Sequence, residues 1–123
     1  MIDILLQHPA EPQQIQLALA TFYQLREGFG LASWRERKTY HTIPLSGDVA
    51  LLLSVYQDAK DEPGLAAFLA RYFQCKVIIS DDAIGPYTWL LIDETGKKQP
   101  IDQDPEVEQE DWFMVAPRHK HLL

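Results

Sequence analysis

The chain has 123 residues, a length that fits one domain able to bury a core without metals or disulfides. Hydrophobic residues make up 46% and charged residues 24%, which argues against a disordered chain. The net charge is −7, but six acidic residues and no Lys or Arg lie in Asp102–Asp111, so the rest of the chain is close to neutral. The net charge of the whole chain is therefore no argument that every part of its surface repels nucleic acid.

The first third of the chain predicts a strand, a helix and a second strand. Residues 1–7 alternate apolar and polar side chains, which is typical of a short strand, and we expect it at a sheet edge. Residues 11–28 carry a proline in the first turn and an apolar stripe at helical spacing. Residues 31–43 alternate again and end at Pro44, which predicts another strand.

Two further helices are predicted in the middle of the chain. The first follows a cap at Ser46 or Asp48 and covers residues 49–60, because its apolar residues recur at helical spacing. The second covers residues 61–74, with Asp61 as its N-cap and an apolar stripe facing inward. These helices would pack against the sheet that the strands form.

Strand signals fill the remainder of the chain. Three successive strands are predicted over residues 75–80, 87–93 and 97–102, the last at an edge because it contains a proline. A fourth strand follows Asp102–Asp111, which we call the acidic loop. The order of elements predicts one α+β domain, residues 1–123, in which three helices of the N-terminal half pack on one face of a mostly antiparallel sheet with a C-terminal strand meander. We expect residues 117–123 to be a flexible tail.

One segment, Val49–Ile79, shares a helix-to-strand pattern with a known family. It resembles part of the baseplate wedge subunits of type VI secretion systems and contractile phage tails, over about a quarter of the chain. The matching residues are Gly64, Leu65, Leu69, Tyr72, Phe73, Val77 and Ile79. All are core positions that any helix packed on a strand would use, so the resemblance implies only a structural subunit of a larger assembly as one alternative.

No motif predicts a metal, a cofactor or an activated nucleophile. The acidic loop has carboxylates at calcium-like spacing but places Val107 where such a loop needs Gly and Phe113 where it needs Glu. His119 and His121 are too few to bind a metal by themselves. Cys75 follows a predicted helix C-terminus, which does not lower a thiol pKa, so we expect a buried, unreactive thiol.

The only basic cluster, Trp34–Ile43, contains Arg35, Arg37 and Lys38. Nucleic-acid-binding domains carry a basic excess over a whole face, whereas this chain has 18 acidic and 11 basic residues. Alternating charges are instead typical of a solvated edge strand. A protein-binding edge, which would also allow a homo-oligomer, and an anion site are the alternatives; we do not expect nucleic acid as a partner.

Cysteine content and hydropathy favour a cytoplasmic protein. A single cysteine excludes an internal disulfide, and the N-terminus lacks the basic and apolar regions of a secretory signal. No apolar run reaches the roughly 20 residues of a membrane span, so no membrane partner is expected.

The sequence favours a non-enzymatic protein-interaction module, such as an adaptor, an inhibitor or an immunity-type protein, that binds a basic protein partner through its acidic loop. The expected contact residues are Asp104, Glu106, Glu108, Glu110 and Trp112, followed by Trp34, Arg35 and Arg37. Two alternatives stay open: a small enzyme with a site around His41, Asp81 and Asp82, and a structural subunit of an assembly such as a contractile-injection baseplate.

Overall fold

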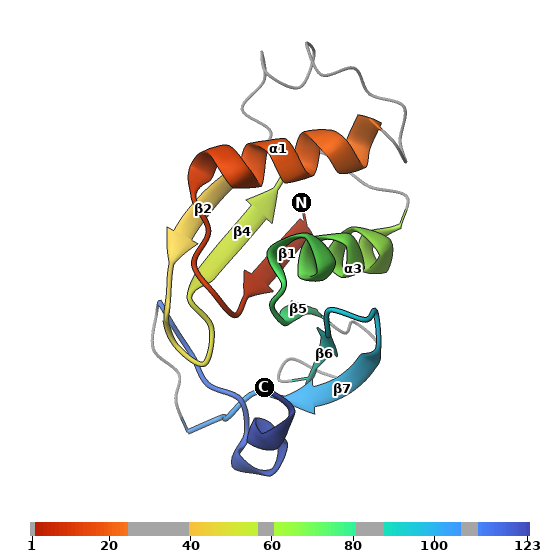
Figure 1. The fold of residues 1–123 in the computed structure, drawn as a ribbon. Coiled ribbons are helices and arrows are strands. Elements are labelled where there is room, and N and C mark those ends of the chain that lie inside the picture. Colours follow the sequence, from red (N-terminus) through yellow and green to blue (C-terminus); the bar gives the residue numbers. More distant parts are fainter. Residues whose placement is uncertain (1, 25–39, 57–60, 81–87, 107–110) are drawn as a thin grey trace.

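The computed structural model describes residues 2–24, 40–56, 61–80, 88–106 and 111–123 (Figure 1). Its strands are β1 (Ile2–Leu6), β2 (Tyr40–Pro44), β3 (Ser46–Gly47), β4 (Leu51–Val55), β5 (Val77–Ser80), β6 (Thr88–Ile92), β7 (Lys98–Asp102) and β8 (Trp112–Phe113). Its helices are α1 (Pro12–Phe22), α3 (Glu62–Phe73) and the 3-10 helix η2 (Pro117–Leu122). No helix in these described ranges is long and apolar enough to cross a membrane.

Six of the strands form one sheet in the order β2-β4-β1-β5-β6-β7, and every neighbouring pair is antiparallel. The successive strands β5, β6 and β7 form the predicted C-terminal meander. Strands β3 and β8 form a separate parallel pair. The α+β class and the antiparallel sheet are confirmed.

Helices α1 and α3 cover one face of the sheet (Figure 1). Alternate residues of the strands point into this layer, as the two-residue period of a strand requires, and meet the apolar stripes of both helices. The largest fully buried side chains in this first core are Tyr23, Phe22, Ile4, Leu6, Ile15, Leu19, Leu53, Leu65, Leu69 and Ile92. The prediction of helices on one face is confirmed for α1 and α3.

The ends of α3 follow from local chemistry. Asp61 is the predicted N-cap, and its side chain accepts a hydrogen bond of 2.9 Å from the backbone N–H of Gly64. The helix ends at Gln74, which adopts the left-handed conformation with φ of 52°. The next residues can therefore turn directly into β5.

A second core lies on the opposite face of the sheet. Leu5, Ile78, Leu91 and Ile101 are buried there under Phe113 and Val115 of the C-terminal segment. Leu122 and Leu123 pack against the same cluster. Residues 117–122 form η2, at the bottom of Figure 1, and the flexibility expected of residues 117–123 stays a prediction.

The predicted helix over residues 49–60 is wrong. The segment contains β4, which lies between β1 and β2 inside the sheet. Four of its five residues are buried. The helices cover one face of the sheet, and the second core covers part of the other face. A strand buried on both faces reads as a continuous apolar run, and periodicity alone does not separate it from a buried helix.

The positions of the edge strands were predicted in part. Among the described strands, β2 and β7 lie at the two edges, as expected from their charge alternation and from Pro100. The expectation that the first strand lies at an edge is wrong, since β1 is paired on both sides, with β4 and with β5. The alternation of β1 reflects a single polar residue, Asp3, among four buried ones.

Candidate functional site

The acidic loop is the site that the sequence predicts, and the structure describes its two ends. Asp104, Glu106 and Trp112 are described, whereas Glu108 and Glu110 lie outside the described residues. The second part of the predicted surface, Trp34, Arg35 and Arg37, also lies outside them. The described part of this surface is therefore the base of the loop.

Strand β8 holds the C-terminal end of the loop against β3. The backbone N–H of Ser46 donates to the carbonyl of Asp111, and that of Asp48 donates to the carbonyl of Phe113, both at 2.8 Å. Gly47, with φ of 101°, lies so close to Phe113 that a Cβ atom would overlap its carbonyl oxygen. This pairing fixes the backbone of β8 and with it the direction in which the side chain of Trp112 points.

Trp112 is the exposed aromatic residue of this surface. Its relative exposure is 42%, whereas the adjacent Phe113 is 5% exposed and makes an edge-to-face contact with Trp89 at 5.3 Å between ring centroids. Phe113 therefore anchors β8 in the second core and leaves the neighbouring indole in solvent. An exposed, backbone-anchored Trp is a common anchor of protein interfaces.

Not every acidic side chain of the loop is available to a partner. Asp104 accepts a hydrogen bond of 3.0 Å from the backbone N–H of Glu106, which shapes the start of the loop. Asp102 forms an ion pair with Arg118. The carboxylates of Glu106 and Asp111 are exposed and have no ion-pair partner among the described residues.

The C-terminal helix η2 brings cations to the base of the acidic loop, which the sequence analysis missed. Arg118 pairs with Asp102, and Lys120 lies 3.8 Å from the carboxylate of Asp48. The basic run 118–121 is the sequence signal for these cations. Folding therefore reduces the negative charge that a count along the sequence assigns to this surface.

A second candidate is a cleft of about 310 Å³ between α3 and the turn that joins β6 to β7. The helix contributes Gly64, Ala67, Phe68 and Arg71, and the turn contributes residues 94–96. Sequence reasoning missed this cleft because the two walls are far apart in the chain. Of its charged groups, Arg71 has no ion-pair partner among the described residues.

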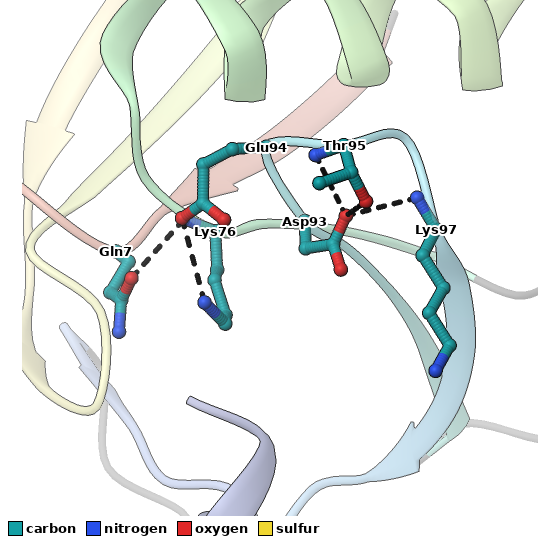
Figure 2. Close-up of polar contacts among 6 residues, drawn as sticks. All are labelled: Gln7, Lys76, Asp93, Glu94, Thr95 and Lys97. Atoms are coloured by element: carbon teal, nitrogen blue, oxygen red, sulfur yellow. Dashed lines mark hydrogen bonds and ion pairs between the residues drawn. The ribbon is translucent and has the colours of Figure 1, made fainter.

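The polar groups of the turn bind one another (Figure 2). Asp93 accepts hydrogen bonds from the hydroxyl and backbone N–H of Thr95 at 2.6 and 2.9 Å and from the backbone N–H of Lys97 at 3.0 Å. The Thr95 hydroxyl, together with these backbone donors, holds the pKa of Asp93 below its ordinary value. This carboxylate is a structural cap of the turn.

Glu94, on the wall of the cleft, is likewise engaged within the chain. Its carboxylate lies 3.5 Å from Nζ of Lys76, whose backbone N–H donates to the side chain of Gln7 at 3.1 Å (Figure 2). Arg71, which lines the cleft together with Phe68, is thus a cation without an ion-pair partner in the part of the chain that the structure describes. These groups are too few to indicate a reaction or a ligand class.

Of the residues proposed for an enzyme site, His41 is described. In the sheet it lies opposite Ser54 of β4, and Ser54 lies opposite Asp3 of β1. The Ser54 hydroxyl donates to Asp3 at 2.7 Å, and the ring of His41 is hydrogen-bonded to Tyr56. In a catalytic triad the serine donates to the histidine and the histidine to the carboxylate. Here the serine proton is directed to the carboxylate and the serine is 3% exposed, so the three residues do not form a nucleophile.

The partners proposed for His41 follow the end of β5 in the sequence. Strands β4 and β1 separate β2 from β5, which places Ser80, at the end of β5, about 14 Å from His41. Asp81 and Asp82 follow Ser80 in sequence and lie outside the described residues.

Burial accounts for the behaviour expected of the single thiol. Cys75 is fully buried, and this burial raises its pKa, so little of it is the reactive thiolate near neutral pH. Within the described residues, no group of three or more His, Cys, Asp or Glu side chains is placed to hold a metal ion.

Comparison with known proteins gives no family or relative. No protein-family model, no curated protein and no solved structure matches this chain.

Proposed function

We propose that this protein is a non-enzymatic interaction module that binds a basic protein partner through the base of its acidic loop and Trp112. The single observation that carries the proposal is the exposed indole of Trp112 on the same loop as Glu106 and Asp111, whose carboxylates have no ion-pair partner among the described residues. Aromatic anchors and complementary charge are the two features that most often give protein interfaces their affinity and their association rate.

The arrangement of β8 supports the use of Trp112 as an anchor. Phe113 and the parallel pairing with β3 immobilise the backbone on either side of the indole. A side chain on a fixed backbone loses less conformational freedom on binding than one on a mobile loop. Trp112 is 42% exposed and belongs to neither buried core, so replacing its side chain removes no core contact.

The charge at this surface supports a basic partner. Glu106 and Asp111 are exposed on either side of the loop, and Glu108 and Glu110 lie between them in the sequence. Clustered charge of one sign steers an oppositely charged partner and raises its association rate, and it does so less as salt increases. Association should therefore weaken with ionic strength.

The same proposal assigns the module to the cytoplasm, where an adaptor, inhibitor or immunity-type protein would meet an intracellular partner. The free thiol of Cys75, which forms no disulfide, supports a reducing compartment. A structural role in a larger assembly remains the alternative, and it would rely on the same type of surface contact.

The proposal is tested by quantitative pull-down from a lysate of the native host. The bait would be the native chain and a variant carrying Glu106→Gln, Asp111→Asn and Trp112→Ala. Asn suits position 111 because Asp111 has φ of 64°, a conformation that Asn adopts readily. We expect the variant to capture basic proteins at least about tenfold less than the native chain does, because that is the loss expected for one anchor residue.

A matched control carries Glu11→Gln and Glu62→Gln, which remove two exposed carboxylates at the starts of α1 and α3. This control should retain the captured proteins if the acidic loop is the binding surface. Equal capture by the native chain and the triple variant would contradict the proposal, as would an equal loss in the control.

A further inference from the structure

The C-terminal residues 117–123, which we call the C-terminal strap, lie across the second core and are fastened by few contacts. Leu122 and Leu123 pack on the core, Arg118 pairs with Asp102, and Lys120 lies near Asp48. A 3-10 helix of six residues has little stability of its own. The strap is therefore held by its tertiary contacts.

One of these contacts depends on the protonation state of a histidine. The backbone N–H of Asp102 in β7 donates a hydrogen bond of 3.0 Å to Nδ1 of His119. An imidazole nitrogen accepts a hydrogen bond only when it carries no proton. The bond thus requires neutral His119 with its proton on Nε2.

Protonated His119 has no equivalent contact in the same position. A proton on Nδ1 would face the N–H of Asp102, which is also a donor. The carbonyl oxygen of Asp102 already accepts from the backbone N–H of Ala116 at 2.8 Å, and its carboxylate is paired with Arg118. The charged ring therefore loses its hydrogen bond and places a donor against the N–H of Asp102, which favours movement of the ring away from β7.

We propose that the C-terminal strap is a pH-sensitive cover of the second core, which opens when His119 is protonated at Nδ1. Opening separates Arg118 and Lys120 from their acidic partners and exposes the apolar surface against which Leu122 and Leu123 pack. The device would couple mild acidification to the exposure of a second, apolar interaction surface.

The electrostatic surroundings favour this direction. Among the described residues, the charged and titratable groups that contact the strap or lie on it beside His119 are Asp102 of β7, Asp48 between β3 and β4, and Arg118, Lys120 and His121 of η2. Partial burial, and then the positive charges of Arg118 and His121, lower the pKa of His119 from its ordinary value. The closed strap is therefore fully favoured above about pH 6.5 and loses this contribution as the pH falls through the pKa of His119.

The test uses nuclear magnetic resonance on the full chain between about pH 7.5 and about pH 5.5, a range in which ordinary carboxylates stay ionised. We expect the exchange protection of the Asp102 amide to fall about tenfold as the pH decreases, the effect of losing one hydrogen bond. Its chemical shift should follow the titration midpoint of the His119 ring. An amide that keeps its protection, or titrates with a different midpoint, would overturn the proposal.

Two variants separate His119 from other titrating groups. His119→Gln supplies a carbonyl acceptor that does not titrate, so the strap should stay closed over the whole range. His121→Gln changes the neighbouring exposed histidine and should retain the pH dependence of the native chain. Loss of the pH dependence in His121→Gln, or its persistence in His119→Gln, would contradict the role of His119.

Discussion

Replacing Gly47 with alanine tests the contact between β3 and β8 that positions Trp112. A non-glycine residue at positive φ costs about 1–2 kcal/mol. The new Cβ would also overlap the carbonyl oxygen of Phe113 and lie 2.9 Å from the sulfur of Met114, so the two strands must separate. The flanking backbone hydrogen bonds, both of 2.8 Å, would then weaken, at about 1 kcal/mol each.

Together these effects predict a loss of roughly 3–4 kcal/mol in the free energy of unfolding for Gly47→Ala. The assay is urea denaturation followed by circular dichroism, with the slope compared between variants to confirm that the denatured state is unchanged. The control is Gly96→Ala, because Gly96 also has positive φ, 89°, but a Cβ there meets nothing within 4 Å. It should cost only the strain of about 1–2 kcal/mol. Equal costs for the two variants would refute the close contact of β3 with β8.

Three further predictions concern single side chains. Asp61→Ala should lower the free energy of unfolding by about 1 kcal/mol because it removes the N-cap of α3, whereas Asp61→Asn should retain most of it, as measured by urea denaturation. The carboxyl resonance of Asp93 should titrate below pH 3.8, and Thr95→Val should raise its midpoint because it removes the hydroxyl donor. The contribution of ionised Asp93 to stability is present above the ordinary pKa of an Asp and is lost as the pH falls through the folded pKa of Asp93. Cys75 should react with a thiol reagent far more slowly in the native chain than in urea, and equal rates would contradict its burial.

Local signals predicted the elements whose ends have their own chemistry. Asp61 marks the start of α3, Gly96 occupies the positive φ of the turn between β6 and β7, and Pro100 lies in an edge strand. Each of these residues restricts or caps the backbone irrespective of the rest of the fold. Such residues can be interpreted without knowledge of tertiary contacts.

Elements that depend on burial were predicted poorly. Leu52 and Leu53 fit a helical spacing as well as a strand buried on both faces, and only the presence of two cores decides between them. The position of β1 in the middle of the sheet also depends on long-range pairing. Neither property is encoded within a short window of sequence.

At the candidate surface, too, local properties could be predicted from the sequence and properties that depend on tertiary contacts could not. Exposure of Trp112 follows from its alternation with buried Phe113, so the sequence could predict it. The neutralisation of Asp102 by Arg118 could not be predicted, because it requires η2 to fold back onto β7. Counting charge along the chain therefore overestimated the negative charge of the loop.

The most direct test of the proposed interaction surface is chemical-shift mapping of the native chain with a synthetic Lys/Arg-rich peptide and an acidic peptide of equal length. We predict that the basic peptide perturbs the indole of Trp112 and the amides of Glu106 and Asp111, that added salt reverses the effect, and that the acidic peptide perturbs none of them. Perturbations confined to other acidic positions, such as Glu11 and Glu62, with Trp112 unchanged, would contradict the account.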